Sequence, residues 1–177
     1  EALKCAQGLT SNVSAITFHE GAANELSNYN LNEIIFAKNE NLNSYSPLHY
    51  TKALEALIDD SCNAILFAHT YETRDWVPRL SVRTNYPFIS DCIDLKNEND
   101  SLIITRQTYQ GKLNNDFQLN TNVFCSIQSG CFKADDLENG TTQVNTVEVD
   151  LSGVANTIRA EEKFKEQKGG VDLTAAD

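Results

Sequence analysis

The sequence has 177 residues, a length that predicts one domain large enough to bury a hydrophobic core. Its 14 Lys and Arg residues stand against 25 Asp and Glu residues, and the net charge of −11 repels phosphate backbones, so we expect no nucleic-acid partner. No apolar run approaches the roughly 20 residues that cross a bilayer, so we expect no membrane span.

Helix and strand patterns alternate over the first half of the chain. Apolar residues at helical spacing predict helices over 1–9, 21–28, 46–59 and from the turn 69–73 to residue 84. Short apolar runs between turn signals predict strands over 13–18, 33–37, 64–68 and 87–93, and residues 38–43 predict a solvated loop. This order predicts parallel strands joined by right-handed helical crossovers, an α/β fold.

The run 64–68, AILFA, is typical of a strand that is covered on both faces. The turn 69–73 follows it, and Thr73 or Asp75 is expected to cap the next helix, with Pro78 close enough to the helix start to be tolerated. This turn lies at the carboxyl end of its strand, where open α/β sheets place their sites.

The pattern changes after residue 93. Residues 96–100 predict a solvated loop, and close turn signals predict a mixed or antiparallel extension of the sheet, with short strands over 101–109, 116–119, 123–127 and 146–151. Residues 156–168 fit either a helix or a strand.

The sequence offers few groups for cofactor or metal chemistry. It contains no Gly-rich phosphate loop, and its three histidines, at 19, 49 and 69, never fall at metal-ligand spacing, so no metal site is expected. A packing role is favoured for His69, because no nucleophile motif or carboxylate partner is evident beside it. The five cysteines include no Cys-x-x-Cys pair, which favours a reducing compartment.

Four stretches resemble a known family in the order in which they occur. Residues 70–80, TYETRDWVPRL, followed by Ser90 and Asp91, resemble the T-x-x-G-R-D-x-x-P-R-L … S-D signature in the amino-terminal domain of the electron transfer flavoprotein alpha subunit. Residues 106–112 are similar to its R-x-x-Y-x-G-K, residues 126–132 to its T-x-R-P-G-x-F, and residues 171–177 to its V-D-L-T-x-A-D. Three positions depart from the family pattern: Thr73 stands in place of Gly, and Gln128 and Ser129 replace Arg and Pro.

This resemblance implies a three-layer sandwich with a mainly parallel sheet, of the adenine-nucleotide alpha-hydrolase type, plus an antiparallel extension. It implies that residues 1–168 are an amino-terminal domain without its first strand, which leaves an exposed gap in the sheet. It also implies an extended strand within 156–168 that pairs with 147–151, and the start of a linker to an absent flavin domain in 169–177.

The function that the resemblance implies is electron carriage. A heterodimer with a beta subunit would take electrons from flavin dehydrogenases, such as acyl-CoA dehydrogenases, and pass them to a quinone oxidoreductase. FAD would be bound mainly by the absent domain, so this domain is expected to be a scaffold, without a catalytic group or a cofactor of its own. The expected location is the bacterial cytoplasm or, alternatively, the mitochondrial matrix.

Two groups of residues are candidates for an interface or an anion site. In the first, Arg74 and Arg79 beside a helix amino terminus suit a phosphate or carboxylate; alternatively, Asp75 caps its own helix and pairs with Arg79. The second is a ligand loop or an interdomain contact, formed by Arg106, Tyr109, Gly111 and Lys112.

The resemblance favours contact roles for both groups. The competing hypothesis is a stand-alone adenine-nucleotide-binding module that uses the loop after residue 68.

Overall fold

The computed structural model describes residues 1–59, 61–99, 101–155 and 158. Its helices are α1 (Ala2–Leu9), α2 (Glu20–Leu26), α3 (Pro47–Leu57) and α4 (Tyr71–Thr84), with short 3-10 turns η1 (Glu40–Leu42) and η2 (Ala134–Asp136). Its strands are β1 (Ser14–Thr17), β2 (Glu33–Lys38), β3 (Ala64–Ala68), β4 (Phe88–Glu98), β5 (Ser101–Thr108), β6 (Leu113–Leu119), β7 (Val123–Ile127) and β8 (Val144–Glu148). The strand expected within 156–168 and the linker expected at 169–177 lie outside the described residues, apart from residue 158.

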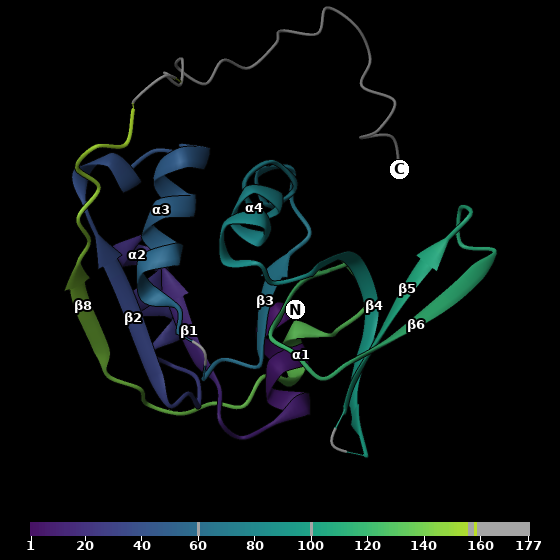
Figure 1. The fold of residues 1–177 in the computed structure, drawn as a ribbon. Helices are drawn as coiled ribbons and strands as arrows, with labels where there is room; N and C mark the ends of the chain where they lie inside the picture. The colour runs from purple at the N-terminus through teal and green to yellow at the C-terminus, as the bar shows by residue number, and fades with distance from the viewer. Residues whose placement is uncertain (60, 100, 156–157, 159–177) are drawn as a thin grey trace, which may run out of the picture.

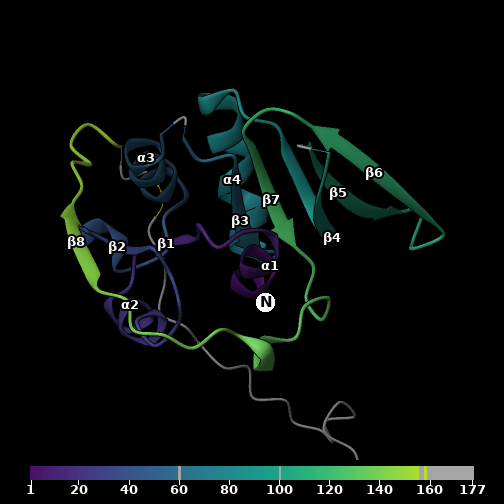
Figure 2. The ribbon, with the colours of Figure 1, turned by 90° about the horizontal axis from the view of Figure 1, so that it is seen from below.

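The strands form two sheets. The first has the order β1-β2-β8 and is parallel throughout, and the second has the order β3-β7-β4-β5-β6. In the second sheet β3, β7 and the start of β4 are parallel, whereas β4, β5 and β6 are antiparallel to their neighbours (Figure 1). Figure 2 shows α3 and α4 on one side of the strands and α1 and α2 on the other. The predicted three-layer α/β fold with a mainly parallel sheet and an antiparallel extension is confirmed.

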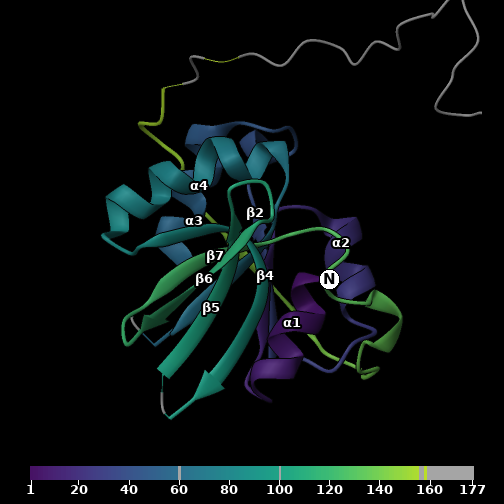
Figure 3. The same cartoon turned by 90° about the vertical axis from the view of Figure 1, so that its right-hand side faces the viewer.

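The buried strand β7 lies at the centre of the second sheet. All five of its residues are buried, and it pairs in parallel with β3 on one side and with β4 on the other. Four of its five residues are apolar, as expected for a strand with both faces covered, and Ser126 is the one polar exception. In Figure 3, α4 and α1 lie on opposite sides of this sheet.

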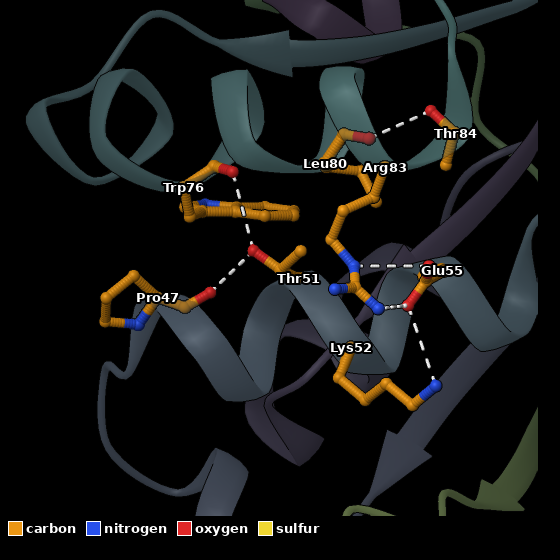
Figure 4. Close-up of polar contacts among 8 residues, drawn as sticks. All are labelled: Pro47, Thr51, Lys52, Glu55, Trp76, Leu80, Arg83 and Thr84. Atoms are coloured by element: carbon orange, nitrogen blue, oxygen red, sulfur yellow. Dashed lines mark hydrogen bonds and ion pairs between the residues drawn. The ribbon is translucent and has the colours of Figure 1, made fainter. Parts of the chain in front are cut away.

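Helices α3 and α4 pack against one another above the strands. Trp76 and Leu80 of α4 share a hydrophobic core with Leu54 of α3 and Phe124 of β7. At the surface edge of this contact, Arg83 donates two hydrogen bonds to the Glu55 carboxylate, at 2.7 and 3.2 Å (Figure 4). The Arg83 guanidinium holds the pKa of the Glu55 carboxyl below its usual value.

Helix α1 covers the opposite side and touches both sheets. Its Cys5 belongs to a core with Cys92 and Cys125 of the second sheet. Its Leu3 and Ala6 pack instead against the core that lies beside the first sheet. The two sheets are therefore joined by the helices that cover them.

The start of α4 differs from the sequence prediction. Thr70 is the N-cap, and its side chain accepts a hydrogen bond from the Thr73 backbone N–H at 3.1 Å, so the prediction of Thr73 or Asp75 as the cap was wrong. The helix begins at Tyr71, within the predicted turn, and Pro78 consequently lies inside the helix. Proline there offers no N–H to the carbonyl four residues earlier, which costs one hydrogen bond of the helix.

Three further expectations are corrected. Residues 96–98 belong to β4, because β5 pairs with their backbone whatever their side chains are. The predicted solvated loop 38–43 contains η1, whose Leu42 is fully buried, and Asn39 donates from its side chain to the Val149 carbonyl at 2.8 Å. The strands after residue 93 were expected in one mixed or antiparallel extension; β7 fits the mixed second sheet, but β8 lies in the first sheet, where it pairs in parallel with β2.

The facing edges of the two sheets are open. Among the described residues, β1 pairs only with β2, and β3 pairs only with β7. The Val13 carbonyl accepts from Asn32 of the β2 side, and the Asn63 carbonyl accepts from Val123 of β7. Backbone groups alternate in direction along a strand, so those of Ile16 and Leu66 point toward the open side.

The packing of α4 predicts that shortening a side chain lowers the stability of the fold on the buried side of the helix and leaves it unchanged on the exposed side. Leu80→Ala is expected to lower the free energy of unfolding by about 2–5 kcal/mol, because Leu80 is fully buried in the core between α3 and α4. Val82→Ala, on the same helix but 83% exposed, is the matched control and is expected to change it by less than about 0.5 kcal/mol. Chemical denaturation measures both; equal losses would contradict this packing.

The open edges predict a further parallel strand between β1 and β3, at the place where the family resemblance expects one. In the polypeptide as the cell makes it, the amides of Ile16 and Leu66 are expected to exchange with solvent as slowly as those of Ala15 and Ile65, which face their paired strands. Hydrogen exchange followed by NMR measures each amide. Exchange about a hundredfold faster at Ile16 and Leu66 alone would show that the edges stay open.

Candidate functional site

Three polar side chains meet where the parallel strands of the second sheet end. His69 follows β3, Ser126 lies near the end of β7, and Asp91 lies within β4. Because β7 lies between β3 and β4, these strand ends are neighbours. This is the edge at which α/β sheets generally carry their ligands.

Hydrogen bonds connect the three residues. The His69 Nδ1 atom lies 2.8 Å from the Ser126 hydroxyl oxygen, and the Asp91 backbone N–H donates to the same oxygen at 3.0 Å. The His69 Nε2 atom lies 3.7 Å from the Asp91 carboxylate, close enough for a charge interaction but longer than a hydrogen bond. We call these three residues the strand-end network.

The strand-end network holds strained backbone in place. Asp91 has a φ of 62°, a conformation that costs a non-glycine residue about 1–3 kcal/mol. Its N–H is held by Ser126, and the neighbouring Cys92 carbonyl accepts from the Gln128 N–H at 2.8 Å. The network therefore fixes the place where β4 changes from parallel pairing with β7 to antiparallel pairing with β5.

The same residue types form nucleophilic triads, but this geometry does not suit one. Ser126 is fully buried, so a substrate carbon has no approach to its hydroxyl. In a catalytic triad, the carboxylate bonds the histidine nitrogen that does not bond the serine, and the serine oxygen is free to attack a substrate. Here the Ser126 oxygen already accepts a hydrogen bond from the Asp91 backbone N–H. The strand-end network therefore has a structural role, which is to hold the backbone of β4 at Asp91 against β7.

The sequence-based interpretation of His69 is partly corrected. A packing role agrees with the geometry, but His69 does have a carboxylate neighbour in Asp91 and a hydroxyl partner in Ser126. Both partners are far from His69 in sequence; Ser126 lies near the end of a predicted strand and Asp91 lies within another. The rule that parallel strand ends meet at one edge was the available signal.

One surface hollow lies beside each sheet. One of about 390 Å³ lies at the start of α4 and is lined by His69, Thr70, Tyr71 and Arg74. The other, of about 670 Å³, lies at the amino ends of β1, β2 and β8, away from the strand-end network, and is lined mainly by polar side chains: Asn12, Ser14, Asn32, Glu33, Gln143, Val144 and Asn145.

The hollow at the start of α4 does not fit a flavin. Its Tyr71 side chain is 87% exposed and covers no cavity, and the Arg74 guanidinium lies 5.6 Å from the centre of the Tyr71 ring. A ring system needs walls that remove most of its surface from water. Across the part of the chain that the structure describes, no group of three or more His, Cys, Asp or Glu side chains suits a metal ion.

The first candidate group divides into two roles. Asp75 does not cap α4; it accepts a hydrogen bond from the Tyr45 hydroxyl at 2.7 Å and lies 3.9 Å from Arg79. Burial and the neighbouring Asp75 carboxylate raise the pKa of the Tyr45 phenol. Asp75 therefore ties the segment before α3 to α4, while Arg74 stays on the exposed side against Tyr71.

The second candidate group is spread along the β5–β6 hairpin. Arg106 lies within β5, beside Cys92 of β4 and Asn115 of β6, and its buried Nε atom has no hydrogen-bond partner among the described residues. Tyr109, Gly111 and Lys112 lie in the turn, at the upper right of Figure 1. Tyr109 is 76% exposed, and the turn carries positive φ angles of 52° at Tyr109 and 79° at Gly111.

Comparison with known proteins identifies the family. The family model described as "Electron transfer flavoprotein domain" matches residues 1–152. The chain belongs to the electron transfer flavoprotein domain family.

Curated members of this family are similar over most of the chain. The electron transfer flavoprotein subunit alpha of Bacillus subtilis (strain 168) is 24% identical over 160 residues, 89% of this chain and 49% of that protein. Protein FixB of Clostridium saccharobutylicum is 28% identical over 157 residues, 86% of this chain and 47% of that protein. The chain therefore spans about half the length of these relatives.

Two of the three departures from the electron transfer flavoprotein pattern, Thr73 and Gln128, fit this structure. Thr73 stands inside helix α4, a position that requires no glycine conformation, and its hydroxyl lies 3.1 Å from that of Thr70. Gln128 replaces an arginine but keeps a backbone role, because its N–H donates to the Cys92 carbonyl. Nothing in the structure explains Ser129.

The cysteines are expected to fall into two classes of reactivity toward thiol reagents. Cys62 and Cys131 are exposed and are expected to react with a thiol reagent in the folded chain, whereas Cys5, Cys92 and Cys125 are buried and are expected to react only after unfolding. Burial and the nearby carboxylates of Glu1, Asp91 and Asp94 raise the pKa of the Cys131 thiol. Its alkylation rate is therefore expected to keep rising with pH above the pH range in which an ordinary thiol ionises.

Mass mapping of the modified cysteines after brief alkylation measures both classes. Because burial raises the pKa of Cys5 to about 12, this thiol serves as the internal negative control. Labelling of Cys5 at the rate of Cys62 would contradict the packing of α1.

Proposed function

We propose that this chain is the amino-terminal part of an electron transfer flavoprotein alpha subunit. In a heterodimer with a beta subunit, it would take electrons from flavin dehydrogenases, such as acyl-CoA dehydrogenases, and pass them to a quinone oxidoreductase. The family match over residues 1–152 supports this most directly. The relatives come from bacteria, which supports a cytoplasmic location.

In this proposal the domain is a scaffold and FAD is held outside residues 1–177. The described residues support this division, because the hollow at the strand ends has no walls for a flavin and the strand-end network is committed to holding β4. The surfaces left for contact are the exposed side of α4, with Arg74 and Arg79, and the turn of the β5–β6 hairpin, with Tyr109 and Lys112.

A stand-alone adenine-nucleotide-binding module is the second candidate. The hollow at the start of α4 favours it, because Arg74 and a helix amino terminus both attract an anion. Two observations weigh against it: the sequence has no Gly-rich phosphate loop, and the exposed carboxylate of Glu72 lies in the first turn of α4. Calorimetric titration with AMP separates the candidates.

The proposed function predicts a flavin-containing complex whose assembly depends on α4. The polypeptide as the cell makes it, co-expressed with its beta subunit, is expected to co-purify with that subunit and to show flavin absorption bands. Arg79→Ala is expected to weaken the association by about tenfold, because Arg79 is an exposed cation whose contact with Asp75 is long. Binding of the beta subunit to the immobilised alpha variant measures this change.

Lys38→Ala is the matched control. Lys38 is also an exposed cation in a surface ion pair, at 3.5 Å from Glu148, but it lies on β2, away from α4 (Figure 1). Its substitution is expected to leave association unchanged. Equal binding of Arg79→Ala and the unsubstituted protein would remove α4 from the interface, and an AMP-binding protein without flavin or partner would support the second candidate.

A further inference from the structure

Three aromatic side chains form a row from the core to the surface. Trp76, the one tryptophan of the sequence, is 6% exposed, and its ring centre lies 5.9 Å from that of Tyr50. The Tyr50 ring centre lies 5.4 Å from that of Tyr45, and both contacts are edge-to-face. Tyr45 is half-buried, so this aromatic row of Trp76, Tyr50 and Tyr45 reaches the surface in two steps.

Both phenols of the aromatic row have a basic partner. The Tyr45 hydroxyl donates to the Asp75 carboxylate at 2.7 Å, and the Tyr50 hydroxyl lies 3.3 Å from the His19 Nε2 atom. Core packing accounts for the ring contacts, but Tyr45 is near enough to solvent for water to satisfy its hydroxyl. Packing alone therefore does not require a carboxylate at the outer end of the row.

A hydrogen-bonded base changes the redox chemistry of a tyrosine. A phenol that loses an electron becomes a strong acid, so its oxidation is favourable only if the proton leaves in the same step. A carboxylate at hydrogen-bond distance takes that proton without any rearrangement. Of the two phenols, that of Tyr45 has the shorter bond and an anionic acceptor, which makes it the end of the row where an oxidising equivalent stops.

We propose that the aromatic row is a path for one-electron oxidation, which carries an oxidising equivalent from the buried Trp76 to Tyr45 at the surface. The proposal rests on the ring contacts and the two phenol hydrogen bonds alone and is independent of the proposed function. The initiating oxidant is a one-electron radical oxidant, which is reduced to its anion as Trp76 becomes a radical cation.

The transfer balances within the row. One electron moves from Tyr45 through the Tyr50 ring to the Trp76 radical cation, which returns to neutral tryptophan. The phenol proton of Tyr45 moves to the Asp75 carboxylate, which becomes a carboxylic acid. The products are a neutral tyrosyl radical and a neutral acid, so the charge of the radical cation and that of the carboxylate cancel. A thiolate in solution can then give one electron to the tyrosyl radical and become a thiyl radical, while the proton returns from Asp75 to the Tyr45 oxygen, so the core does not carry the damage.

Pulse radiolysis of the full polypeptide with azide radicals tests the path. These radicals oxidise tryptophan faster than tyrosine, and time-resolved absorption separates tryptophanyl from tyrosyl radicals. The signal that belongs to Trp76 is the difference between the unsubstituted protein and Trp76→Phe. In that difference, the tryptophanyl radical is expected to decay at the rate at which a tyrosyl radical rises.

Two conservative variants decide where the radical goes. Tyr45→Phe keeps the ring and Asp75→Asn keeps the size of the side chain, and each is expected to lose most of the tyrosyl signal that depends on Trp76. Tyr109→Phe, in the exposed hairpin turn, is the control and is expected to keep that signal.

An unchanged tyrosyl yield in Tyr45→Phe would overturn the proposal. So would a tryptophanyl radical that decays at one rate in all variants. Circular dichroism establishes that each variant is folded, and if Asp75→Asn unfolds, Tyr45→Phe alone decides the outcome, because it leaves the ring packing intact.

Discussion

The second sheet depends on one buried strand that makes hydrogen bonds on both of its sides. β7 has no exposed residue, and it lies between β3 and β4 although the β5–β6 hairpin separates it from β4 in sequence. A strand in this position must find all of its backbone partners inside the protein, because water does not reach it. Its pairing therefore determines where β3 and β4 end and which side chains meet there.

Ser126 shows the consequence of this burial for a polar side chain. Its hydroxyl is as inaccessible as the backbone around it, so its hydrogen bonds must also be satisfied internally. His69 and the Asp91 N–H supply them from the two neighbouring strands. The strained backbone of Asp91 lets one strand begin in a parallel ladder and continue in an antiparallel one. The direction in which the hairpin leaves the sheet is thus tied to a polar contact at the strand ends.

Patterns that depend on neighbours in sequence predicted the structure well. The strand over 64–68 and the strand over 123–127 have the predicted bounds, because both are mainly apolar runs of strand length between turn signals. The helix cap at Thr70 was missed because polar residues crowd the turn and several of them can cap. The polar residues 96–98 predicted a loop, since a hairpin with a solvated face carries little apolar signal.

Contacts between distant residues explain most of what the sequence did not predict at the site. Tyr45 and Asp75 are 30 residues apart, and His69 and Ser126 are 57 apart, so neither pair leaves a local pattern. The sequence also did not predict that β8 lies beside β2. The two strands are more than one hundred residues apart, so no local pattern indicates their parallel pairing. The general rule about strand ends located the site, but only the assembled sheet showed its members.

The charged run at the start of α4 combines residues with different physical roles. Asp75 binds Tyr45 and lies near Arg79, so its charge is engaged within the domain. Arg74 rests on the exposed Tyr71 ring and has no carboxylate partner among the contacts of the described residues. In a chain of net charge −11, such a cation beside a helix amino terminus is a local site of positive potential. Asp75 therefore helps to hold the fold together, whereas Arg74 remains a candidate for the association that we propose.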